Sequence, residues 1–217
     1  MQLASGQKLL FIGDSITDSD RSKPEGEGLF HALGRGYVSF VDGLLQATYP
    51  ELAIRVVNKG TSGHTVRDLK ARWQEDVIEQ RPDWLSIMIG INDVWRQYDT
   101  PYITDYHIYI DEYEATLREL ISEAQSIVPN IILMTPFYIE PNEQDAMRAT
   151  MDQYGAVVKA LGAELSLPVV DTQAAFNKAL AHIYPATLAW DRVHPGAGGH
   201  LLLAKAFLKE VGFVWDR

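Results

Sequence analysis

The chain alternates between short apolar runs and longer amphipathic stretches, five times over. The apolar runs are rich in Ile, Val and Leu and show no clean polar–apolar alternation, as expected of strands covered on both faces. They lie at residues 8–13, 53–58, 84–90, 130–135 and 168–171. The amphipathic stretches lie at residues 37–48, 65–80, 110–126, 143–166 and 197–211 and predict helices. This repeated order predicts a three-layer α/β/α sandwich in which right-handed crossovers connect five parallel strands.

The length of the chain and the even distribution of its sequence features predict a single domain over residues 1–217. No internal repeat, low-complexity tract or linker divides the sequence, and 217 residues are enough for one well-buried core. Cysteine is absent, which excludes disulfides, cysteine nucleophiles and thiolate metal sites. The core must therefore hold the fold together by packing alone.

Charge and hydropathy exclude two classes of partner. The 19 basic and 29 acidic residues give a formal net charge of −10, which disfavours binding to a phosphate backbone, so we expect no nucleic-acid partner. No run approaches the roughly 20 apolar residues of a membrane-spanning helix. The start, MQLASGQKLLFIGDS, lacks the long apolar core of a secretory signal. We expect a cytoplasmic protein with no membrane partner.

The loops that follow the predicted strands carry the candidate chemistry, because the carboxyl ends of parallel strands share one edge of the sheet. Gly13-Asp14-Ser15 follows the first strand. Ser15 is either an exposed nucleophile or, with Asp14, part of a helix cap, and the motif alone supports both equally. It lacks the Gly-x-Ser-x-Gly pattern of α/β-hydrolases. Asn92 follows the third strand and either stabilises a turn or donates to a ligand oxygen.

Two further segments are weak evidence for a functional site when each is taken alone. Gly60 and Gly63 follow the second strand and suggest a tight turn. Asp191 and His194 stand three residues apart before the last helix, where a carboxylate could orient an imidazole. They could also form part of a metal site, but the other histidines show no ligand-like spacing with them. We therefore expect no metal.

Together these segments resemble the SGNH (GDSL-type) hydrolase superfamily. Gly-Asp-Ser at residues 13–15, Gly60, Gly-x-Asn at 90–92 and the Asp191/His194 pair match its four marks, with Ile16 where the family name has leucine. The resemblance covers the chain from Lys8 to the last helix and implies a flavodoxin-like fold. Stretches such as IMIGINDVWRQ, ILMTPFYIE and AWDRVHP look like the bacterial acetylxylan esterases of this superfamily.

The resemblance implies a Ser-His-Asp acyl-enzyme mechanism without a cofactor. Ser15 would be the nucleophile, His194 the general base and Asp191 its orienting carboxylate. The N–H groups of Ser15 and Gly60 and the side chain of Asn92 would form the oxyanion hole. The expected substrate-binding residues are Asp14, Trp95, Arg96 and Trp190, with Asp14 serving the Ser15 turn more than the substrate.

The expected activity is removal of acetyl groups from acetylated xylo-oligosaccharides, with a small acetylated saccharide as the binding partner. The main alternative is a short-chain thioesterase or lysophospholipase of the same superfamily. A non-catalytic carbohydrate-binding domain is a weaker alternative, since it would not need Ser, Asn and His at one edge. A homo-oligomer is a further expectation, because aromatic side chains are enriched at interfaces. Its candidate contacts, which could equally be core residues, are Tyr184, Trp190, Phe213 and Trp215.

Overall fold

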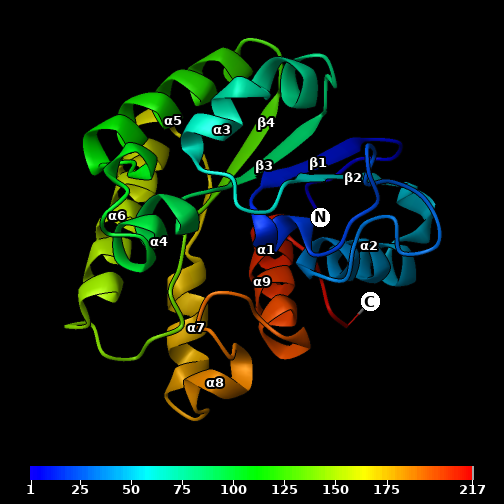
Figure 1. Ribbon diagram of the computed structural model, residues 1–217. Helices are drawn as coiled ribbons and strands as arrows, with labels where there is room; N and C mark the ends of the chain where they lie inside the picture. Colours follow the sequence, from blue (N-terminus) through cyan, green and yellow to red (C-terminus); the bar gives the residue numbers. More distant parts are fainter. Residues whose placement is uncertain (217) are drawn as a thin grey trace.

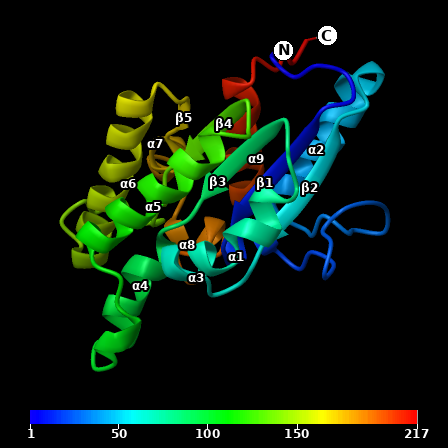
Figure 2. The same cartoon turned by 90° about the horizontal axis from the view of Figure 1, so that it is seen from above.

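A parallel sheet of five strands in the order β2-β1-β3-β4-β5 forms the centre of the computed structural model, which describes residues 1–216 (Figures 1 and 2). The strands are β1 (Lys8–Gly13), β2 (Arg55–Gly60), β3 (Trp84–Met88), β4 (Asn130–Met134) and β5 (Val169–Val170). All four strand pairings are parallel, with β1 and β3 buried along nearly their whole length. The predicted α/β fold with five parallel strands is confirmed.

Helices cover both faces of this sheet. They are α1 (Ser15–Asp18), α2 (Tyr37–Thr48), α3 (Val66–Ala71), α4 (Ile91–Asp99), α5 (Ile110–Gln125), α6 (Ala146–Leu165), α7 (Thr172–Leu180), α8 (Pro185–Leu188) and α9 (Ala197–Glu210). Short helical turns add Pro50–Leu52, Gln74–Ile78 and Thr104–Tyr106. The helices α2 and α9 pack together beside β1, whereas α3, α5 and α6 lie on the opposite side of the sheet (Figure 1). No helix within residues 1–216 is long and apolar enough to span a bilayer.

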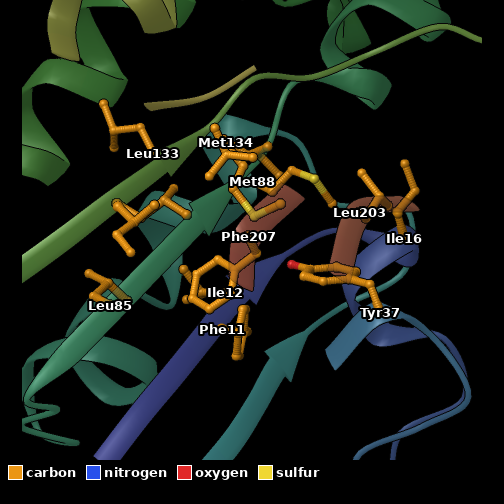
Figure 3. Packing of buried hydrophobic residues seen from close by; sticks show 14 of the residues in the cluster. Phe11, Ile12, Ile16, Tyr37, Leu85, Met88, Leu133, Met134, Leu203 and Phe207 are labelled. Carbon is orange, nitrogen blue, oxygen red and sulfur yellow. The ribbon is translucent and has the colours of Figure 1, made fainter. Parts of the chain in front are cut away.

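One helical layer, formed by α2 and α9, packs against the sheet around β1. Phe11 of β1 packs edge-on against Tyr37 of α2, with ring centroids 5.6 Å apart, and lies 4.8 Å from Phe207 of α9 (Figure 3). All three side chains are fully buried. Burying one large aromatic side chain contributes about 1.5–3 kcal/mol, so this group fixes α2 and α9 onto the sheet.

The register of the sheet brings three strand ends to one edge. Gly13 at the end of β1 pairs with Gly60 of β2 on one side and Met88 of β3 on the other. The segments that follow these strands therefore start side by side. They carry Ser15, the loop 61–65 and the first turn of α4.

The predicted helices at 37–48, 110–126, 143–166 and 197–211 are present with small shifts at their ends. The stretch 65–80 is divided, because α3 ends at Ala71 and a π-helical turn, Gln74–Ile78, follows. The helices α4 and α7 were not predicted. Both begin two or three positions after a strand end, where the strand pattern predicts a loop, and Asn92 lies in the first turn of α4.

Candidate active site

A sharp turn after β1 exposes Ser15 at the edge of the sheet. Asp14 is the N-cap of α1, and its carboxylate accepts a hydrogen bond from the Ile16 N–H at 3.0 Å. Gly13 is required for the turn, because a Cβ there would lie 2.4 Å from the Met88 carbonyl oxygen. Ser15 is the first residue of the helix, where backbone N–H groups have no helical acceptor. Capping and an exposed hydroxyl are thus both present, in adjacent residues.

The Ser15 hydroxyl, the His194 ring and the Asp191 carboxylate form a continuous hydrogen-bonded relay. Ser15 Oγ lies 2.8 Å from His194 Nε2, and His194 Nδ1 lies 2.6 Å from Asp191 Oδ2. An ionised carboxylate only accepts hydrogen bonds, so Nδ1 carries the proton and Nε2 accepts from the serine. The relay therefore has the tautomer that a general base needs.

The loop around Asp191 holds this carboxylate ionised. Its Oδ1 accepts from the backbone N–H groups of Val193 at 2.9 Å and His194 at 2.8 Å. Partial burial acts to raise the pKa of Asp191, but the hydrogen bonds from His194 and Val193 outweigh burial and lower it. The Trp95 ring packs against the His194 imidazole, with ring centroids 5.8 Å apart and an interplanar angle of 62°.

Asn92, in the first turn of α4, lines the same pocket as Ser15. One N–H of its Nδ2 donates to the His64 carbonyl at 2.9 Å, which fixes the amide. The other N–H is unused by any residue within 1–216. Because Asn92 lines this pocket, the free N–H is available to a bound oxygen.

The prediction that Gly60 donates to an oxyanion is wrong in this structure. The Gly60 N–H already donates to Asn58 Oδ1 at 2.8 Å, and its carbonyl accepts from Arg21 Nε at 2.6 Å. Gly60 is buried and does not line the Ser15 pocket. Gly63 does line it, and within the described chain its N–H has no acceptor.

Gly63 was not predicted, because from the sequence either Gly60 or Gly63 could face the site. The sequence does not separate the two glycines, but the structure does: Gly60 is the last residue of β2, whereas Gly63 lies in the loop that follows, with φ of +82°. Such a conformation is common where a backbone N–H must approach a ligand.

The catalytic pocket is open and has a volume of about 520 Å³. Trp95 and Arg96 line it as predicted for substrate-binding residues, and the Arg96 guanidinium lies 4.5 Å from the Trp95 ring centroid. The prediction for Asp14 is wrong, because this side chain is 1% exposed beneath the serine turn and cannot touch substrate. Trp190 is 89% exposed and lies outside the pocket lining, so its contact with substrate stays a prediction.

Two buried carboxyl groups lie behind the pocket. Burial raises the pKa of Asp14 and of Asp93 to about 7 each. Asp93 Oδ1 accepts from the Val66 N–H at 2.9 Å, which connects α4 to the start of α3, whereas its Oδ2 has no partner in the part of the chain that is described. No cluster of three or more His, Cys, Asp or Glu suited to a metal occurs within residues 1–216.

The chain closely resembles characterised esterases over its full length. It is 69% identical to an acetylxylan esterase of Geobacillus stearothermophilus, covering 100% of this chain and 99% of that protein. The crystal structure of this enzyme, Axe2, superposes with a TM-score of 0.99 over 100% of this chain and 99% of that one. LAE5, an α/β hydrolase from the metagenome of Lake Arreo, gives a TM-score of 0.96 at 52% identity, covering 98% of both chains.

Catalytic mutants of Axe2 identify three positions that matter in that enzyme. They carry the substitutions S15A, D191A and H194A. Each mutant is 68% identical to this chain, and its structure superposes with a TM-score of 0.99 over 100% of this chain and 99% of the mutant. This chain has the same residue types at those numbers, Ser15, Asp191 and His194, joined by the relay described above. Residues 11–202 match the model of the GDSL-like lipase/acylhydrolase family. The chain therefore belongs to the GDSL-like lipase/acylhydrolase family, and the resemblance predicted from its four sequence motifs is confirmed.

Proposed function

We propose that this protein is a serine esterase that removes acetyl groups from short acetylated xylo-oligosaccharides. The observation that carries the proposal is the relay of 2.8 Å and 2.6 Å from Ser15 through His194 to Asp191, at the edge of an open pocket. The 69% identity to an acetylxylan esterase supports the choice of substrate.

In the proposed mechanism, Ser15 Oγ attacks the acetyl carbonyl carbon while His194 Nε2 takes the serine proton. The carbonyl oxygen becomes an oxyanion, which accepts hydrogen bonds from the backbone N–H groups of Ser15 and Gly63 and from Asn92 Nδ2. Asp191 stabilises the imidazolium that results. The bond between the acetyl carbon and the sugar oxygen then breaks, and the sugar oxygen leaves with the proton from His194.

The acetyl-serine intermediate is hydrolysed by the same groups. A water molecule gives one proton to His194 Nε2 as its oxygen attacks the acetyl carbon, and the N–H groups again stabilise the oxyanion. The bond to Ser15 Oγ breaks and His194 returns the proton to it. Acetic acid is released and gives its proton to the solvent, and the enzyme is back in its starting state without a cofactor.

A short-chain thioesterase or lysophospholipase is the second candidate, and the lipase/acylhydrolase character of the family favours it. The pocket argues for the sugar. Arg96 and Asp20 face it with charged groups, and Trp95 offers a flat ring on which a sugar can stack. An acyl tunnel would instead gain about 0.8 kcal/mol for each buried CH₂ group from aliphatic walls.

The experiment compares kcat/KM on acetylated xylobiose with kcat/KM on nitrophenyl esters of increasing acyl length. Acetate release from the sugar, with efficiency falling beyond butyrate, is the expected result. Efficiency that rises with chain length, or no acetate from the sugar, would favour the lipid-directed alternative. Ser15→Ala should abolish turnover of every ester, by roughly 10⁶ in kcat.

We also propose that the protein is cytoplasmic and self-associates. A cytoplasmic enzyme of this kind would act on oligosaccharides after import, and cell fractionation tests the location. Tyr184, Trp190 and Trp215 are 72%, 89% and 46% exposed and are candidate interface residues, whereas Phe213 is buried in the core. Light scattering on the purified protein would test self-association.

A further inference from the structure

His200, on α9, faces the catalytic pocket with a hydrogen-bond donor that the mechanism does not use. Its side chain is 7% exposed, and its Nδ1 accepts a hydrogen bond from the Tyr37 N–H at 3.2 Å. A ring nitrogen that accepts carries no proton, so in the neutral ring Nε2 carries it. Burial, with a smaller effect from His194, lowers the pKa of His200 to about 4, so the ring is neutral near pH 7.

The Nε2–H of His200 has no protein acceptor among residues 1–216. It is also not among the fully buried polar atoms without partners, which in the described chain are Trp73 Nε1, Asp93 Oδ2 and Arg96 Nε. His200 lines the catalytic pocket. The free N–H is therefore reached from the pocket, where a buried but unpaired donor is costly unless a ligand or water accepts from it.

Ser19 presents a second free polar group on the same wall. A Cβ built on Gly36 would lie 2.8 Å from Ser19 Oγ and 3.0 Å from His200 Cε1, so both side chains pack against this glycine. The Ser19 hydroxyl has no hydrogen-bond partner in the described part of the protein, and Ser19 lines the pocket. Ser19 and the adjacent Asp20 both adopt left-handed conformations, with φ of 41° and 64°.

The loop before α2 holds this wall in place. The Ser19 carbonyl accepts from the Arg35 N–H at 2.7 Å, and Gly34 approaches so closely that a Cβ there would lie 2.5 Å from the same oxygen. The carboxylate of Asp20 is exposed beside Ser19 and faces the pocket. The wall thus offers one N–H donor, one hydroxyl and one carboxylate.

We propose that Ser19 and His200 form a binding subsite for a free hydroxyl group of the saccharide whose acetyl ester is cleaved. A sugar hydroxyl both donates and accepts, so it can accept from His200 Nε2–H and donate to Ser19 Oγ. Asp20 accepts from a neighbouring hydroxyl. Trp95 and Arg96 line the pocket from α4, which stands apart from α1 and α9 in both views (Figures 1 and 2). The subsite therefore adds recognition from a second direction.

The subsite rests on the proposed saccharide esterase function and makes a separable prediction. A hydrogen bond between neutral groups contributes about 0.5–1.5 kcal/mol, which corresponds to a loss of about two- to tenfold when one partner is removed. Only a substrate with sugar hydroxyls should suffer this loss. Nitrophenyl acetate, which has none, should not.

The experiment measures kcat/KM of Ser19→Ala and His200→Asn on monoacetylated xylobiose and on nitrophenyl acetate. Ser19→Ala removes a hydroxyl without a protein partner, so folding should be unaffected. In His200→Asn the amide oxygen can take the place of Nδ1 and accept from Tyr37, but the Nε2–H donor is lost. Both variants should lose about two- to tenfold on the sugar ester and less than twofold on nitrophenyl acetate.

Ser39→Ala is the matched control. The Ser39 hydroxyl donates to the Gly36 carbonyl at 2.8 Å, in the first turn of the same helix that His200 caps, but it lies outside the pocket lining. It should leave both substrates unaffected. Equal losses on both esters, or a Ser19→Ala variant with full activity on the sugar, would overturn the subsite. A wild-type protein that cleaves nitrophenyl acetate but not the sugar ester would instead refute the proposed function itself.

Discussion

Gly60 at the end of β2 and Gly63 in the loop that follows have opposite steric environments. A Cβ on Gly60 would lie 2.2 Å from the Asp18 backbone nitrogen, whereas a Cβ on Gly63 would meet no atom within 4 Å. The chain beside Gly60 is backbone and cannot move aside cheaply. The two alanine substitutions should therefore fail in different ways.

Gly60→Ala should unfold the protein or cost more than about 3 kcal/mol of stability, because it overpacks the junction of β2 and α1. Gly63→Ala should cost only about 1–2 kcal/mol, since its φ of +82° strains an alanine. Its N–H would shift, and kcat should fall by about 10- to 100-fold. Urea unfolding and kcat measured on the same samples distinguish the two, and an active, folded Gly60→Ala variant would contradict this assignment.

Asp93 should make the protein less stable as pH rises. Burial raises the pKa of Asp93 in the folded state to about 7, from its ordinary value of 3.8, so between these values the folded state holds a proton that the unfolded state has released. Stability is therefore full below pH 4 for this group and is lost progressively up to about pH 7.

Asp93→Asn should flatten this dependence. The amide oxygen can still accept from Val66 N–H, but the group no longer titrates. Relative to wild type, the slope of unfolding free energy between pH 5 and 7 should become less negative by about 1.4 kcal/mol per pH unit. Urea unfolding at four pH values from 5 to 8 measures the slope, and an unchanged slope would show that Asp93 is not the titrating group.

Arg72 connects several elements behind the catalytic serine. It caps the C-terminus of α3, and its guanidinium donates to the carbonyls of Gly13 at 2.8 Å and Lys59 at 2.6 Å, the ends of β1 and β2. Its Nε donates to His64 Nδ1 at 3.1 Å, and the His64 carbonyl in turn anchors Asn92. One planar side chain thus holds together the segments that carry the nucleophile and the oxyanion donors.

Arg72→Lys should lower kcat by at least about tenfold while KM changes little, because an ammonium cannot reproduce the fork of the guanidinium. Arg67→Ala is the matched control on the same helix. Arg67 pairs with Glu112 on the surface, at 2.8 Å, so its loss should cost less than about 1 kcal/mol and leave kcat unchanged. A similar kcat for both variants would show that the Arg72 contacts do not position the site.

We propose that residues 1–217 form one cooperative domain. The proposal is supported by a single cluster of buried hydrophobic residues that runs from Leu3 to Phe213 and includes both helical layers. The two ends also meet, since the Gln2 N–H donates to the Val211 carbonyl at 2.8 Å. Thermal unfolding followed by circular dichroism and by tryptophan fluorescence should show one coincident transition, and two separated transitions would refute a single domain.

Much of the architecture was predictable from local pattern. The apolar run KLLFIG predicted β1 with its bounds unchanged, and the stretch at residues 37–48 predicted α2 equally well. The helix α4 was not predicted, although INDVWRQYD is amphipathic, because a nine-residue segment with five polar side chains is also compatible with a loop. The packing of α4 against α6 is long-range and cannot be read from the segment itself.

The sequence by itself determined the alternation of strands and helices, the family, and the residue types that meet at the strand ends. Only the tertiary structure decided which of these residues are free to act. Gly60 cannot donate to the oxyanion because its N–H is bonded to Asn58, and Asp14 cannot touch substrate because it is buried. Gly63 and His200, in contrast, keep an unpaired N–H in the pocket. Local sequence sets which donors a segment carries, but the competing acceptors come from segments distant in the chain, so their availability is settled only when the whole fold packs together.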